Sequence, residues 1–139
     1  MRVPTWLYGH EPSTPLATHI AKYFQNSIRE EGLLAIGQQG VVFTEGSAGT
    51  IHEIFQDAAQ NYYKTFGYFS PMVFLGVDYW GTRFPVRQIL SALLKKEEFS
   101  RLVLFTDDYE AAHDFILNFR PPEPRSSGFA ALHDPARIT

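Results

Sequence analysis

Residues 40–53 read GVVFTEGSAGTIHE, in which an apolar run passes through a short glycine-containing turn into an amphipathic segment. The run at residues 40–44 is typical of a buried strand, and the segment after the turn repeats apolar residues at helical spacing. Two glycines between a strand and a helix leave backbone N–H groups exposed at the start of the helix, where they attract anions. The stretch therefore predicts a strand, an anion-binding turn and a helix in direct succession.

The predicted helix has one apolar stripe, made of side chains at helical spacing: Ile51, Ile54, Phe55, Ala58, Ala59 and Tyr62. Because successive residues of a helix are rotated by about 100°, Glu53 is expected nearly opposite the stripe, with Thr50 and Asp57 on the same side as Glu53. Glu53 would then lie one turn from an anion at the glycine turn. A carboxylate so placed could act as an acid or base, or could only complement the positive end of the helix.

The rest of the chain alternates apolar strands with amphipathic helices. Strands are expected at residues 3–8, 41–44, 72–77 and 102–105, and helices at residues 15–24, 27–36, 51–62, 86–96 and 109–119. Strands that are apolar throughout and alternate with helices indicate a parallel sheet covered on both faces. We therefore expect one α/β domain over residues 1–119, followed by an irregular tail over residues 120–139.

Local signals support three of these helices. The residues Ser13-Thr14-Pro15 provide a cap followed by proline at the first position of the first helix, whose apolar stripe would be Leu16, Ile20, Ala21 and Phe24. Ser27 and Glu30 have the spacing of a capping box at the start of the second helix, which Gly37 ends. On the last helix, the inward-facing residues are expected to be Ala112, Phe115 and Ile116.

Composition excludes several classes of protein. The chain has 139 residues, a net charge of −3 and no cysteine, which fits one globular domain without disulfides or thiolate metal sites. No apolar stretch reaches the length of about 20 residues that a membrane helix needs, and a nucleic-acid-binding protein would carry a basic surface. The five histidines lack metal-ligand spacing, so no metal site is expected. A cytoplasmic protein without membrane or nucleic-acid partners is the expectation.

Several features of the chain allow more than one interpretation. The glycines could only permit a tight turn and close helix packing, and Arg29 could be a solvated helix residue. The turn matches neither the Walker loop nor the dinucleotide-binding fingerprint. The aromatic segment at residues 62–69 fits an interface and a packed loop equally well. Four strands amount to one half of a doubly wound fold, so the edge strand at residues 3–8 would need a dimer partner or a further part of a longer protein.

Residues 29–119 resemble the LOG (LONELY GUY) family, whose members are often labelled lysine decarboxylase-like. The family signature PGGxGTxxE follows a buried strand, and EGSAGTIHE at residues 45–53 is similar to it. Arg29 matches a family arginine one helix upstream, if one residue is inserted between them. The strand at residues 71–77 and the pair Asp107 and Asp108 also resemble the family. Glu45 and Ser47 replace the proline and the second glycine of the signature.

The resemblance implies a Rossmann-like three-layer domain with a mostly parallel sheet of about four strands, here without the usual N-terminal half and its own glycine-rich loop. It implies a homo-oligomer, at least a dimer, that binds a nucleoside 5′-monophosphate such as AMP. Active members hydrolyse the N-glycosidic bond to the free base and ribose 5-phosphate, without a metal or a redox cofactor.

The family's site residues carry over by position. The 5′-phosphate would be held by the turn and first helical residues: Gly46, Ser47, Ala48, Gly49 and Thr50. Glu53 would act on the ribose and the attacking water, and Arg29 would assist Glu53. The alternatives are a non-catalytic module that binds nucleotides or phosphate, and a dimerisation module.

Overall fold

The computed structural model describes residues 1–5, 15–93 and 97–122. Its elements in chain order are α1 (Asn26–Ile36), β1 (Val41–Phe43), α2 (Ala48–Tyr63), β2 (Met72–Leu75), the π-helix η1 (Tyr79–Arg83), α3 (Val86–Leu93), α4 (Glu97–Ser100), β3 (Val103–Thr106) and α5 (Tyr109–Asn118). The strands form one sheet in the order β1-β2-β3. Both pairings are parallel, so the chain has a Rossmann-like α/β fold.

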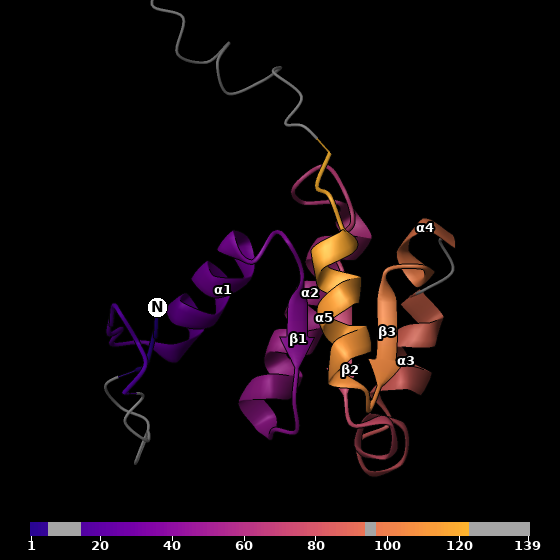
Figure 1. The fold of residues 1–139 in the computed structure, drawn as a ribbon, viewed down its shortest axis with the longest axis horizontal. Helices are drawn as coiled ribbons and strands as arrows, with labels where there is room; N and C mark the ends of the chain where they lie inside the picture. The colour runs from indigo at the N-terminus through magenta and orange to yellow at the C-terminus, as the bar shows by residue number, and fades with distance from the viewer. Residues whose placement is uncertain (6–14, 94–96, 123–139) are drawn as a thin grey trace, which may run out of the picture.

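Helices cover the sheet on both faces, as the apolar strands predict. Helix α5 contacts β2 and β3 and lies in front of the sheet in Figure 1. Helices α2 and α3 contact each other behind the sheet, and α1 packs against α2. Parallel pairing directs the carboxyl ends of all three strands to one edge, where ligands bind in open α/β sheets.

The core is built around β2, whose residues Met72, Val73 and Phe74 are fully buried. The ring of Phe74 stacks on Phe43 of β1 and Phe105 of β3, with centroid distances of 5.2 and 4.5 Å. Burying one side chain of this size contributes about 1.5–3 kcal/mol to folding. The central strand is therefore apolar throughout because both of its faces are covered.

The N-terminal predictions are wrong in the described residues. Residues 15–24 are not helical, and Leu16, Ile20 and Phe24 are exposed rather than forming a buried stripe. The chain instead makes two isolated parallel bridges, between Arg2 and Ile20 and between Thr5 and Tyr23. Backbone groups that would close helical turns are used in this pairing, as in the hydrogen bond from the Tyr23 N–H to the Pro4 carbonyl at 3.0 Å.

The sheet accordingly has three strands among the described residues rather than the expected four. Residues 3–5 lie outside the sheet, and residues 6–8 fall outside the described ranges. The strands at the two edges of this sheet are β1 and β3, and Val42 of β1 is exposed. The three strands, and helices α1, α2, α3 and α5, lie where the hydrophobic pattern predicts them, within a few residues, whereas η1 and α4 were not predicted.

The details of two helices differ from the predictions. Gln25, not Ser27, is the N-cap of α1, and it makes no side-chain capping hydrogen bond. The Glu30 side chain does not close a capping box, because it turns toward α2 and bonds to His52. Helix α3 is described as far as Leu93, so the predicted extension through residues 94–96 lies outside the described residues. Most of the predicted tail, residues 123–139, lies outside them as well.

The aromatic segment after α2 is partly a packed loop. Lys64 ends the helix in a left-handed conformation with φ of 51°. Phe69 is buried and stacks on Phe99 with a centroid distance of 5.4 Å. Tyr63 and Phe66 are exposed, so the interface interpretation still applies to these two side chains.

No helix within the described ranges is both long and apolar enough to cross a lipid bilayer.

Candidate functional site

The glycine turn follows β1 at the carboxyl edge of the sheet. A Cβ atom on Gly46 would lie 2.0 Å from the Thr50 Oγ1 atom, so glycine is required for this close approach. The Gly46 carbonyl accepts a hydrogen bond from the Tyr79 hydroxyl of η1, which fixes the turn from the β2 side. π-Helical turns such as η1 often occur at functional sites.

The turn presents the free start of α2. Ser47 is the N-cap and makes no side-chain capping bond. The Ile51 N–H donates to the Ser47 carbonyl at 3.0 Å, and the N–H groups of residues 48–50 precede this first helical bond. Helix geometry leaves those N–H groups without partners inside the helix, so they can bind an anion.

Helix α1 brings Arg29 to this helix start. Its Nη2 atom lies 3.7 Å from the Glu53 Oε1 atom of α2 and 3.6 Å from the Glu30 Oε1 atom of α1. The Arg29 Nη1 atom also donates to the Val3 carbonyl at 3.4 Å. The two residues to which the resemblance gives catalytic roles, Arg29 and Glu53, thus meet across the contact between α1 and α2.

A cavity of about 180 Å³ lies between these helices. Five of the seven expected site residues line it: Arg29, Ser47, Gly49, Thr50 and Glu53. Gly46 and Ala48 do not line it: the first packs against Thr50, and the second is exposed in the first turn of α2. Glu45 is also exposed. The geometry therefore gathers most of the expected residues around one opening.

The Glu53 carboxyl sits in a mixed electrostatic environment. Its side chain is 25% exposed, and partial burial is the main cause that raises its pKa above the ordinary value. The neighbouring Glu30 raises the pKa further, while Arg29 and His52 lower it. Glu53 can therefore exchange a proton at a higher pH than a carboxyl in water.

The sequence analysis missed two residues that line the cavity, Asn26 and Glu30. Glu30 is only 2% exposed and accepts hydrogen bonds from the Asn26 amide and from the His52 Nδ1 atom, the latter at 2.8 Å. Asn26, Glu30 and Leu34 are four residues apart, which places them on the face of α1 that meets α2. Because Glu30 shares a helix face with Leu34, an apolar residue, the sequence could have indicated that Glu30 faces another part of the protein rather than solvent.

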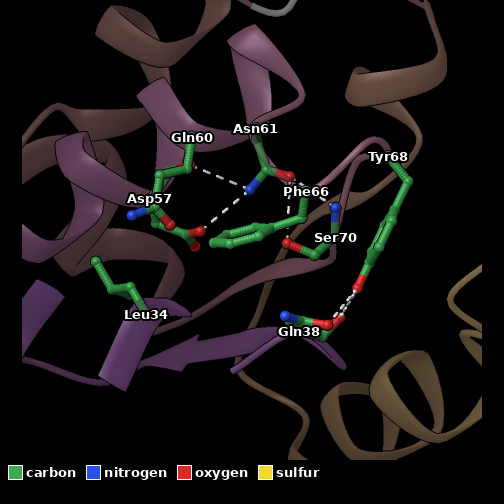
Figure 2. Close-up of a pocket in the computed structure, with 8 residues that line it drawn as sticks. All are labelled: Leu34, Gln38, Asp57, Gln60, Asn61, Phe66, Tyr68 and Ser70. Atoms are coloured by element: carbon green, nitrogen blue, oxygen red, sulfur yellow. Dashed lines mark hydrogen bonds between the residues drawn. The ribbon is translucent and has the colours of Figure 1, made fainter. Parts of the chain in front are cut away.

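Asp57 lies on the same side of α2 as Glu53, as predicted, but it lines a different cavity (Figure 2). Asp57 is buried, and so is Asn61, whereas Ala59 of the predicted stripe is exposed. The Asp57 Oδ1 atom accepts from the Asn61 amide at 3.2 Å, and its Oδ2 atom has no partner among the residues described. Burial raises the pKa of Asp57 to about 7.

The remaining acidic candidates have structural contacts. The Asp107 carboxylate accepts from the Val77 N–H at 2.8 Å, which ties β3 to the loop after β2. Asp108 caps α5, because its Oδ1 atom accepts from the N–H of Glu110 at 2.9 Å. In the part of the chain that the structure describes, no three His, Asp or Glu side chains cluster as metal ligands would.

No protein-family model matches the chain, and no curated protein sequence matches it.

Proposed function

We propose that the protein binds a nucleoside 5′-monophosphate in the cavity between α1 and α2 and hydrolyses its N-glycosidic bond. The observation that carries this proposal is the meeting of Arg29 and Glu53 at 3.7 Å beside the free start of α2. This arrangement supplies anion-binding N–H groups, a cation and a carboxyl within one cavity of about 180 Å³.

The N–H groups at residues 48–50 are suited to the phosphate. They point out of the first turn of α2, and the helix dipole adds a partial positive charge there. The hydroxyl of Thr50 and the backbone of Gly49 also line the cavity. A phosphate at this position would place the sugar of the nucleotide toward Glu53, one turn further along the helix.

Glu53 is suited to activate water. Its carboxylate would accept a proton from a water molecule whose oxygen attacks C1′ of the ribose. The bond from C1′ to the base nitrogen breaks, its electron pair stays with the base, and the base gains a proton from solvent. The products are the free base and ribose 5-phosphate. A carboxylate beside the sugar also stabilises the positive charge that develops on it.

The cavity is smaller than most nucleotide sites. Pockets for ligands of this size commonly have volumes of about 300–1,000 Å³, so about 180 Å³ accommodates the phosphate and sugar better than a whole nucleotide. We propose that the base is covered by a second copy of the chain or by a further part of a longer protein. An oligomer acting in the cytoplasm on free nucleotides fits this arrangement.

A non-catalytic phosphate-binding module is the second candidate. It is favoured by the position of the Arg29 Nη2 atom, which already lies within 3.7 Å of two carboxylates, Glu30 and Glu53. An arginine engaged in this way has less charge available for the reacting sugar. In this case AMP would bind at the start of α2 without being cleaved.

Product analysis with AMP separates the two candidates. The wild-type protein is incubated with AMP, and free adenine and ribose 5-phosphate are measured by chromatography. We expect both products in equal amounts, and a rate lowered about 10²–10⁴-fold in Glu53→Gln. Glu31→Gln is the matched control, because it removes a carboxylate from an exposed position on α1. Stabilisation by AMP without release of adenine would support the binding module and refute hydrolysis.

A further inference from the structure

Glu30 is a buried carboxylate at the contact between α1 and α2. Placing a charged carboxylate in such a position costs free energy unless its oxygens are paired. The Oε1 atom accepts from the Asn26 amide and lies 3.6 Å from the Arg29 Nη2 atom. The Oε2 atom is bonded to the His52 Nδ1 atom at 2.8 Å. Both oxygens are therefore engaged by groups of the protein, which indicates a positioning role rather than a direct contact with a ligand.

One nitrogen of Arg29 is shared between two carboxylates. The Nη2 atom lies at nearly equal distances from Glu30 and Glu53, 3.6 and 3.7 Å. The other terminal nitrogen is directed to the Val3 carbonyl, and the buried Nε atom has no partner within the described part of the chain. The position of the guanidinium beside Glu53 thus depends on how strongly Glu30 attracts it.

The Glu30 carboxylate lies beside Gly49 at the start of α2. A Cβ atom on Gly49 would lie 3.4 Å from the Glu30 Oε1 atom, so the carboxylate reaches the backbone of the proposed phosphate site. His52, which is 59% exposed in its side chain, holds the opposite oxygen of Glu30 from the solvent side. The carboxylate is therefore fixed between the two helices rather than directed into solvent.

We propose that Glu30, anchored by His52, is a positioning residue that divides the Arg29 guanidinium between two carboxylates and thereby controls the charge around Glu53. This inference rests on the proposed function for its role in the reaction. The effect of these charged groups on the ionisation of Glu53 can be measured in the protein without a substrate.

The charged groups that face Glu53 act in opposite directions. Glu30 from α1 repels the ionised form, whereas Arg29 from α1 and His52 from α2 attract it. Glu30→Gln removes the repulsion and frees Arg29 for Glu53, so Glu53 should ionise at lower pH. His52→Gln removes an attracting charge and leaves Glu30 to draw Arg29 away, so Glu53 should ionise at higher pH.

The test measures the ionisation of the Glu53 carboxyl, first by NMR and then through the pH dependence of activity. The carboxyl ¹³C signal of Glu53 is titrated by NMR, with Glu53→Gln providing its assignment. We expect the midpoint to fall by about one pH unit in Glu30→Gln and to rise by a smaller amount in His52→Gln. The exposed control Glu31→Gln should leave the midpoint within about 0.2 units. If AMP is hydrolysed, the acidic limb of the pH–rate profile should move in the same two directions.

The shifts of the Glu53 midpoint test the positioning role of Glu30, whereas the release of adenine from AMP tests the proposed function. Opposite shifts in the two variants support the positioning role, even if the protein releases no adenine from AMP. Unchanged midpoints, or shifts in the same direction, overturn the positioning role, even if AMP is hydrolysed. His52→Gln alters an exposed side chain, so its direction of shift is decisive if Glu30→Gln does not fold: a fall or no change overturns the inference.

Discussion

Thr50 occupies the space that a side chain on Gly46 would need. The distance from the position of a Cβ atom on Gly46 to the Thr50 Oγ1 atom is 2.0 Å, and to the Thr50 Cβ atom it is 2.6 Å. The second contact involves an atom close to the backbone, so a rotation of the Thr50 side chain cannot relieve it. The turn and the first turn of α2 are thus packed directly against each other.

Gly46→Ala should therefore lower stability and displace the start of α2. We expect a loss of about 1–3 kcal/mol in the free energy of unfolding, because the added methyl group forces a shift of the backbone. Urea unfolding measures the loss. Gly32→Ala is the control, since nothing lies within 4 Å of a Cβ atom at that position of α1. The account of the turn is wrong if the two substitutions change stability equally.

Asp57 should make the protein less stable as the pH rises from about 4 to 7. Its pKa in the folded protein is about 7, compared with an ordinary value of 3.8. The folded state therefore holds the proton more tightly, and this contribution is fully present below the ordinary pKa and lost on passing the raised pKa.

Asp57→Asn should remove that pH dependence, because the amide stays neutral. We expect the variant to be more stable than the wild type at pH 8 by roughly 1–3 kcal/mol and similar to it at pH 4. Thermal unfolding over this pH range measures the difference. Asp114→Asn alters an exposed carboxylate of α5 and serves as control. A wild-type protein whose Asp57-dependent stability rises between pH 4 and 7 would contradict the prediction.

Asn61 should be important for stability because its side chain joins Asp57 to Ser70. Its amide donates to the Asp57 Oδ1 atom at 3.2 Å, and its carbonyl oxygen accepts from the Ser70 N–H at 2.6 Å (Figure 2). Asn61→Ala leaves these buried groups without partners, which costs about 2–3 kcal/mol. Denaturant unfolding should show this loss, whereas Asn118→Ala at the exposed end of α5 should change stability by less than about 0.5 kcal/mol. Equal effects would show that the Asn61 contacts contribute little.

The sequence predicted the central elements because their patterns are local. Strand β2 is apolar over its whole length, and α2 repeats Ile51, Ile54 and Ala58 at helical spacing, so each could be assigned from its own residues. The same rule failed at Leu16, Ile20 and Phe24, where spacing by four residues imitates a helical stripe. These residues lie in a segment that pairs with residues 2–5, and such pairing is not visible in a periodicity.

The site was predicted only in part, for a related reason. The turn at residues 45–50 has a motif of its own, and Arg29 was identified through the family resemblance. Glu30 was assigned to a capping box, because its bond to His52 depends on how α1 packs against α2. Asp57 was placed on the correct side of α2, but its burial also depends on that packing. Contacts between helices therefore account for what the sequence analysis missed.

A crystal structure of Glu53→Gln with AMP tests the central claim most directly, because we expect the substitution to slow the proposed cleavage and to leave the start of α2 unchanged. We predict that the phosphate accepts hydrogen bonds from the N–H groups of residues 48–50, with the ribose directed toward position 53. A phosphate bound elsewhere, or an ordered side chain filling the cavity beside Gly49 while AMP is present, would contradict the account.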